Sequence, residues 1–261
     1  MTPTAASAII ALLSLACGVL IWRNLRLRRR LRSAHDELRR GRATPAPTAP
    51  RKSQKTDDHA RLMKLLDLPL DALPRGGDWR VGDDLLLLLV ERMRAEPPEH
   101  VVELGSGLST AVIARQMELT GRGRLWSIEH DAAFLEQTQE TLDQLGLSNR
   151  VTLIEAELTP WDKHTQWYDR AALGALPERI DLLLIDGPPH HAGRTPRHPA
   201  GPELFGRLAE NGLAILDDGR RQKEQKALTR WAEELPEFSQ TPTDTAKQAV
   251  LLRRRAAATQ M

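Results

Sequence analysis

Carboxylates follow five stretches of this chain that have the residue pattern of strands. They are Glu103, Glu129, the pair Glu155 and Glu157, Asp186, and the pair Asp217 and Asp218. Strand patterns alternate with helical ones, which predicts a parallel sheet covered by helices on both faces. The carboxyl ends of parallel strands share one edge, where ligands bind. Any one of these side chains could merely cap a helix, but the set as a whole predicts a polar ligand site.

The first of these strands runs into a glycine turn, Glu103-Leu104-Gly105-Ser106-Gly107. A strand, a tight turn and a helix start present backbone N–H groups to a polar ligand. A dinucleotide fingerprint requires a third glycine where this chain has Thr110, and Glu103 would repel a pyrophosphate. A carboxylate there suits a cationic ligand, such as the amino group and sulfonium of S-adenosylmethionine. Glu129 lies 22 residues after Gly107 and can accept both hydroxyls of a ribose.

Strand and helix patterns position these residues. We expect strands over 101–104, 124–129, 151–155, 180–185, 213–216 and 249–252, and helices over 61–68, 85–94, 131–145, 202–210 and 222–235. Phe134, Leu142 and Leu145 would form one apolar helix face. Ser109 or Thr110 would cap the helix after the glycine turn.

Charge is distributed unevenly along the chain. Residues 1–22 carry no charged side chain, residues 23–55 hold 12 Lys/Arg and two acids, and residues 56–261 hold 25 Lys/Arg and 33 acids. The basic charge therefore lies outside the expected sheet, which disfavours nucleic acid as a partner. The single cysteine, Cys17, excludes an intrachain disulfide.

The first segment, 1–22, is predicted to be a transmembrane anchor. Its 18 mostly apolar residues from Ala5 to Trp22 would span roughly 27 Å, the lower limit for a membrane crossing. Arginines follow at once, which places the C-terminal side in the cytoplasm and argues against a cleaved signal peptide. We therefore expect a single-pass protein of the inner, cytoplasmic membrane, with a basic juxtamembrane segment and Pro-rich linker at 23–56 and a folded domain at 57–261.

Ordered motifs carry a family resemblance over residues 80–253. The glycine turn resembles motif I of class I S-adenosylmethionine-dependent methyltransferases, and Ser127-Ile128-Glu129-His130-Asp131 resembles their ribose-binding motif. Ile185-Asp186-Gly187-Pro188-Pro189 and Leu216-Asp217-Asp218 resemble the motifs that end their fourth and fifth strands. Together with Arg197-His198-Pro199-Ala200, the Asp-Gly-Pro-Pro segment is similar to an uncharacterised bacterial subgroup. The implied fold is a Rossmann-like, doubly wound α/β domain with a mostly parallel seven-stranded sheet.

The resemblance implies roles for individual residues. Glu103, Gly105, Ser106 and Gly107 would line the methionine end of S-adenosylmethionine, Glu129 would hold the ribose, and His130 and Glu157 would lie near the adenine. Asp186 would face both cofactor and acceptor as a catalytic residue, and His190 or His191 could supply the base, with Arg194 and Arg197 binding an anionic acceptor. Asp186, Asp217 and Asp218 correspond to the Mg²⁺ ligands of catechol-type O-methyltransferases. Here Asp218 replaces the usual asparagine, and it could instead cap the next helix.

These observations predict a membrane-anchored S-adenosylmethionine-dependent methyltransferase. We expect it to methylate an oxygen of a small or lipid-linked acceptor, with Mg²⁺ as a possible second cofactor. The alternatives are a nucleotide-cofactor oxidoreductase and a catalytically silent membrane scaffold with the same fold. The sequence leaves the acceptor and the oligomeric state open.

Overall fold

The computed structural model describes residues 52–73 and 81–254, which all fall within the compact unit Pro50–Met261. The predicted anchor at 1–22 and most of the predicted linker lie outside the described residues. None of the helices in the described part is both long and apolar enough to cross a membrane. Helix α2, Lys52–Leu65, takes in residues 52–56 that we assigned to the linker. The ordered domain therefore begins before residue 57.

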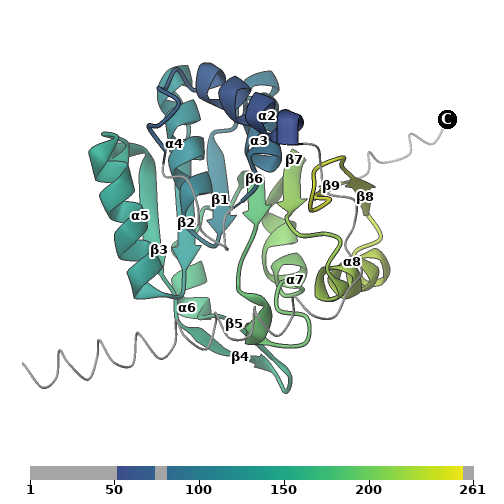
Figure 1. The fold of residues 1–261 in the computed structure, drawn as a ribbon. Coiled ribbons are helices and arrows are strands. Elements are labelled where there is room, and N and C mark those ends of the chain that lie inside the picture. Colours follow the sequence, from purple (N-terminus) through teal and green to yellow (C-terminus); the bar gives the residue numbers. More distant parts are fainter. Residues whose placement is uncertain (1–51, 74–80, 255–261) are drawn as a thin grey trace, which may run out of the picture. The chain divides into compact units, whose positions relative to one another are not determined.

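A seven-stranded sheet forms the middle layer of the domain, as the sequence predicts (Figure 1). Its strand order is β3-β2-β1-β6-β7-β9-β8. The strands are β1 His100–Leu104, β2 Arg124–Glu129, β3 Val151–Glu155, β6 Ile180–Ile185, β7 Leu208–Leu216, β8 Phe238–Pro242 and β9 Val250–Arg254. The first five are parallel, whereas β9 is antiparallel to β7 and to β8. The carboxyl ends of the parallel strands thus meet at one edge.

Alternate residues of the strands face two separate apolar cores. Val101, Leu182 and Leu184 pack against the long helices α3 (Asp83–Ala95) and α4 (Leu108–Thr120). Val102 and Leu183 face the opposite core. That core includes residues of α6 (Arg170–Leu173), α7 (Ala200–Leu204) and α8 (Gln222–Glu234). A strand covered on both faces has little polar sequence, which is why the strand patterns were readable.

The prediction was wrong around the start of β7 and on one face of α5. A helix was expected over 202–210, but α7 ends at Leu204 and β7 begins at Leu208. Asn211-Gly212, which suggested a helix stop, lies inside β7, where the pairing with β6 is irregular. Phe134 is 44% exposed on α5 (Ala132–Gln144), although its expected companion Leu142 is buried.

Two further strands form a hairpin that the sequence did not reveal. Strands β4 (Leu158–Asp162) and β5 (Thr165–Tyr168) pair antiparallel in a separate sheet. In Figure 1 the hairpin lies beyond the carboxyl ends of the parallel strands. Strand β8 was also missed. The hairpin brings the aromatic residues of 161–168 to the edge of the sheet where the carboxylates lie.

Candidate active site at the carboxyl ends of the parallel strands

The glycine turn after β1 is tightly fitted against the end of β6. Gly105 has a φ of +96°, a conformation that favours glycine. A Cβ at Gly105 would also lie 3.1 Å from the backbone nitrogen of Gly187. The Gly105 N–H donates to the carbonyl of Ile128 over 2.8 Å. The turn is therefore held between β2 and β6, its two sheet neighbours.

Thr110 explains why no third glycine is needed. It lies in the first turn of α4, whose N-cap is Gly107 and not Ser109 or Thr110 as predicted. Its hydroxyl accepts from the Gly107 N–H over 2.8 Å and donates to Glu103 Oε2 over 2.6 Å. Ser127 donates to the same carboxylate oxygen over 2.7 Å. In a dinucleotide site the third glycine allows the helix to pack closely on the strand. In this chain the residue at that position instead bonds the buried carboxylate of Glu103.

Glu103 is fully buried beneath the turn. Burial raises its pKa to about 7, although hydrogen bonds from Ser109, Thr110 and Ser127 favour the charged form. Its second oxygen, Oε1, has no hydrogen-bond partner among the described residues. A cationic group above the turn would stabilise the ionised carboxylate.

Glu129 lies at the end of β2 and is oriented by backbone N–H groups. Oε1 accepts from His130 and Asp131 over 2.7 and 2.9 Å, and Oε2 accepts from Ser106 over 3.2 Å. Its side chain is 7% exposed. Each carboxylate oxygen has two lone pairs, so these bonds leave capacity for ligand hydroxyls.

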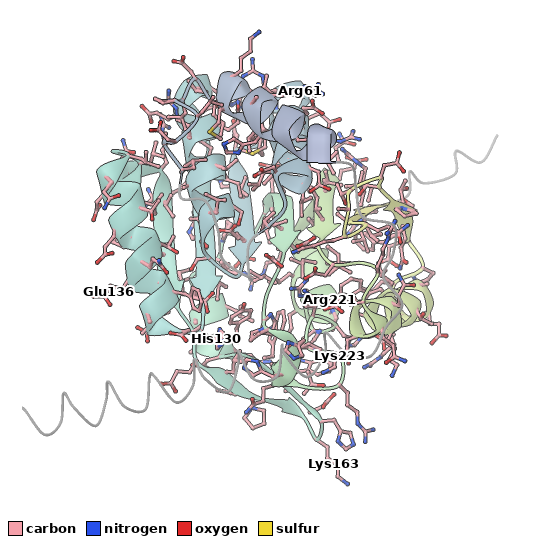
Figure 2. The ribbon with its side chains drawn as sticks, in the orientation of Figure 1. Arg61, His130, Glu136, Lys163, Arg221 and Lys223 are labelled. Atoms are coloured by element: carbon pink, nitrogen blue, oxygen red, sulfur yellow. The ribbon has the colours of Figure 1, made fainter. Side chains whose placement is uncertain are left out.

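Three histidines follow the ends of β2 and β6. The Nδ1 of His130 is 2.6 Å from Glu129 Oε1. Its ring centroid lies 6.5 Å from that of His191, which in turn lies 5.8 Å from that of His190. The contact joins the ends of β2 and β6, the strands on either side of β1. Lys223 of α8 donates to the backbone carbonyl of His190 over 2.6 Å and so fixes this loop; Figure 2 shows His130 and Lys223 at this edge.

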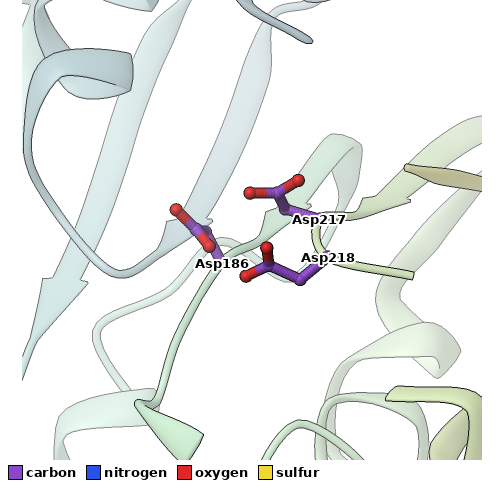
Figure 3. A group of neighbouring side chains, drawn as sticks. All are labelled: Asp186, Asp217 and Asp218. Atoms are coloured by element: carbon purple, nitrogen blue, oxygen red, sulfur yellow. The ribbon is translucent and has the colours of Figure 1, made fainter. Parts of the chain in front are cut away.

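Asp186, Asp217 and Asp218 converge at the ends of β6 and β7 (Figure 3). One oxygen from each lies within 4.8 Å of the others. Burial raises the pKa of Asp186 to about 7 and also raises the pKa of Asp217. Asp218 has a φ of +58°, which aspartate tolerates better than most residues. The three predicted metal ligands are thus brought together.

Cations already contact these carboxylates. Arg197, which is 4% exposed, lies 2.9 Å from Asp186 and 3.4 Å from Asp218. Lys247 Nζ lies 3.4 Å from both Asp217 and Asp218. Arg197 was expected to bind an acceptor, but its burial among carboxylates shows that it holds the strand ends together. The cluster therefore does not present the open, purely anionic ligand set that a divalent cation requires.

Tyr168, the last residue of β5, is buried and 1% exposed. Its hydroxyl has no hydrogen-bond partner among the described residues. Burial, followed by the charge of Glu129, raises its pKa well above the usual value, so the phenol stays protonated. The hydroxyl lies directly beside Gly187, because a Cβ there would lie about 2.2 Å from it.

Replacing Gly187 with alanine is expected to destabilise the protein by about 1–3 kcal/mol through overpacking. The added methyl group would meet the Tyr168 hydroxyl and would lie 3.0 Å from the nitrogen of Gly105. Tyr168→Phe in the same chain should recover part of the loss. Urea unfolding measures both effects. Gly206→Ala is the control, since a Cβ there meets nothing within 4 Å; equal effects at the two glycines would contradict the prediction.

The remaining predicted site residue, Glu157, is exposed between β3 and β4. Its backbone carbonyl accepts from the Asp169 N–H, and its side chain makes no hydrogen bond or ion pair with the described residues of this edge. Sequence reasoning missed Lys247, which lies in the turn before β9. No motif marks this lysine; only the pairing of β9 with the end of β7 brings it to the carboxylates.

A separate cavity of about 950 Å³ lies at the opposite end of the sheet. Its arginines include Arg122, Arg179 and Arg253, which pair with Glu99, Asp181 and Glu96. The cavity is lined by both positive and negative side chains and lies away from the carboxyl ends of the strands. It is therefore separate from the candidate site.

The glycine turn has the features expected for S-adenosylmethionine. A Cβ at Gly107 would meet nothing within 4 Å, so there is open space beside the turn. Ser106 Oγ and Glu103 Oε1 are buried polar atoms without partners among the described residues. The donor set of Glu103 and Glu129 matches a ligand with a positive charge at one end and a ribose at the other.

Comparisons with known proteins agree with this geometry. A family model described as a methyltransferase domain matches residues 102–219. No curated protein sequence matches the chain. Similar solved structures include a methyltransferase of Podospora anserina bound to SAH, with a TM-score of 0.53, 14% identity and coverage of 82% of this chain and 100% of that one. A methyltransferase of Geobacter sulfurreducens has a TM-score of 0.51, 18% identity and coverage of 87% and 96%.

A third structure, the O-methyltransferase TomG of Streptomyces achromogenes in complex with SAM, has a TM-score of 0.51, 15% identity and coverage of 85% and 96%. At these identities the structures establish the fold alone. The family match covers the glycine turn and every strand end that carries a predicted site residue. Together with the site geometry, the match over residues 102–219 supports a S-adenosylmethionine-dependent methyltransferase.

Proposed function

We propose that this protein is an O-methyltransferase that acts on a small or lipid-linked acceptor at the cytoplasmic face of the inner membrane. The observation that carries the proposal is the set of carboxylates at the ends of β1, β2 and β6: the buried Glu103 and Glu129 and the partly exposed Asp186. Similarity to solved O-methyltransferases favours oxygen as the methylated atom.

S-adenosylmethionine, when bound, supplies a methyl group on a positively charged sulfur. Glu103 would face that positive charge, and Glu129 would hold the ribose. The acceptor oxygen would form its bond to the methyl carbon as the carbon–sulfur bond breaks, with the electron pair returning to sulfur. Asp186 is 17% exposed at the end of β6 and is the carboxylate placed to take the acceptor's proton. Positioning of the two reactants would supply much of the rate enhancement.

The direct test uses the purified full chain in detergent. Calorimetry with S-adenosylmethionine measures binding, and incubation with radiolabelled S-adenosylmethionine and fractionated lysate identifies the acceptor class. We expect binding at a stoichiometry of one and label in a lipid or small-molecule fraction. Tight binding of NADH without binding of S-adenosylmethionine would favour the oxidoreductase alternative. Binding without label in any fraction would favour the silent scaffold.

The membrane part of the proposal depends on the apolar segment 1–22 and the arginines that follow it. The full chain should sediment with inner membranes, and residues 43–261 should stay in the supernatant. Since α2 begins at Lys52, this truncation removes no described element. Recovery of the full chain in the supernatant would exclude the anchor.

The pH dependence of binding tests the role of Glu103. Its pKa of about 7 in the free protein means that a nearby sulfonium should drive proton release. We therefore expect the Kd for S-adenosylmethionine to fall as the pH rises toward 7, by at most about tenfold per pH unit, and to level off above about 8. Calorimetry in two buffers of different ionisation enthalpy measures the protons released.

Glu103→Gln should abolish this proton release while keeping an acceptor for Thr110 and Ser127. The same raised pKa implies that the wild-type protein loses stability as the pH rises from 4.5 to about 7, because the unfolded chain ionises first. The glutamine variant should lack that loss. Identical proton release in the two proteins would show that Glu103 does not face the cofactor's charge.

A further inference from the structure

Asp186, Asp217 and Asp218 provide the type of ligand that a divalent cation prefers, yet a guanidinium lies among them. Besides its contacts to Asp186 and Asp218, Arg197 donates to the backbone carbonyls of Asp186 and Asp217, the latter over 3.0 Å. Its Nε lies 3.7 Å from the buried carboxylate of Glu224. These contacts hold the guanidinium on both strand ends. A metal ion on the same three carboxylates would have to displace it.

Lys247 and Arg221 offset further negative charge of the cluster. Lys247 contacts two of the aspartates, and Arg221 lies 2.7 Å from Asp218. Four carboxylates, those of the three aspartates and of Glu224, therefore lie among three cationic side chains. Adding a divalent ion would introduce two further positive charges beside a buried guanidinium, and repulsion between close like charges is strong where water is excluded.

We propose that Arg197 and Lys247 replace the divalent cation of catechol-type O-methyltransferases, and that the Lys247 ammonium holds the acceptor oxygen during a metal-independent transfer. The role of Lys247 in holding the acceptor, the second half of this inference, rests on the proposed function. The replacement of the divalent cation by Arg197 and Lys247, the first half, concerns only the charge cluster.

The exposed fractions of the Arg197 and Lys247 side chains indicate different roles for the two residues. Arg197 is 4% exposed and can reach only protein groups, so it positions the aspartates. The Lys247 side chain is 36% exposed, and among the carboxylates Asp186 is the most exposed at 17%. An acceptor oxygen between them would meet a positive charge on one side and a proton acceptor on the other.

The position of Lys247 suits it to this task. Its Nζ lies 3.4 Å from both Asp217 and Asp218, and two adjacent carboxylates favour the charged form of the amine. The ammonium therefore acts as a hydrogen-bond donor and a charge, not as a base. A preorganised positive charge at a developing negative oxygen commonly contributes about 100-fold to 1000-fold in rate.

Mn²⁺ titration of the full chain, followed by the EPR signal of the free ion, tests the first half without cofactor or acceptor. We expect the wild-type protein to leave the signal of 1 mM Mn²⁺ unchanged and Lys247→Met, which uncovers negative charge, to bind Mn²⁺ at least tenfold more tightly. Stoichiometric binding by the wild-type protein below 1 mM would overturn the proposal.

The second half uses the lysate fraction that takes up label. Lys247→Met should slow labelling at least 100-fold and leave the Kd for S-adenosylmethionine within twofold, whereas Lys247→Arg should retain most of the rate. Lys226→Met, at an exposed lysine of α8, is the matched control. EDTA should not affect the wild-type rate. Loss of labelling in EDTA with recovery in Mg²⁺, or an unchanged rate in Lys247→Met, would refute a metal-independent transfer in which Lys247 holds the acceptor. Absence of label in every fraction would instead count against the proposed function and leave the Mn²⁺ result standing.

Discussion

Replacing Glu129 with alanine is expected to weaken S-adenosylmethionine binding at least 100-fold. Hydrogen bonds to a charged group contribute about 1.5–3 kcal/mol each, and two ribose hydroxyls would lose theirs together. The variant would also free the Ser106 N–H, which donates to Glu129 in the glycine turn. Calorimetry measures the change in Kd directly.

Glu155→Ala is the matched control for this variant. Glu155 pairs with Glu129 in the register between β3 and β2, so it lies at the same level of the sheet, but it is exposed. We expect its Kd to match that of the wild-type protein. Equal affinities for the Glu129 and Glu155 variants would remove Glu129 from the cofactor site.

Replacing Arg197 with methionine is expected to lower the free energy of unfolding by about 3–5 kcal/mol. Methionine has a similar length but no charge, so Asp186 and the buried carboxylates of Asp218 and Glu224 would lose their shared partner. Breaking a buried ion pair on one side leaves uncompensated charge, which accounts for the size of the effect. Urea unfolding at pH 8, where carboxylates are ionised, gives the value.

Arg194→Met tests whether the effect depends on burial. Arg194 is an exposed arginine three residues earlier in the same loop. Its replacement should change stability by less than about 0.5 kcal/mol. Arg197→Lys keeps the charge but not the bidentate reach, and should fall between wild type and Arg197→Met. Losses of similar size at positions 194 and 197 would show that the buried network contributes little.

Much of the site could be predicted because its residues follow strands directly. Glu103, Glu129 and Asp186 are each one residue from, or within, a strand that is buried on both faces. Such strands have an unbroken apolar pattern, and parallel packing puts their ends on one edge. The mostly parallel seven-stranded sheet, the six strands expected by residue range and the S-adenosylmethionine-dependent methyltransferase assignment were confirmed.

Elements with ambiguous local signals were mispredicted. An Asn-Gly pair commonly ends a helix. Here Asn211-Gly212 lies within β7, because the pairing between β7 and β6 is irregular at this point. The β4–β5 hairpin contains Pro160 and charged residues, which are depleted in strands. Phe134 fits an apolar helix face by spacing, yet the packing of α5 leaves it exposed. In each case contacts with distant residues outweighed local preference.

The sequence by itself determined which carboxylates end the strands and which turn can accept a cationic cofactor, because both properties depend on neighbours in the chain. Only the tertiary structure decided what balances those carboxylates. Arg197 lies in the loop after β6, and Lys247 lies in the turn before β9, which pairs antiparallel with β7. Their contacts with Asp186, Asp217 and Asp218 exist because that strand order brings separate loops together and excludes water from them. A cluster that suggested a metal site in sequence is, in the fold, a set of carboxylates already paired with cations.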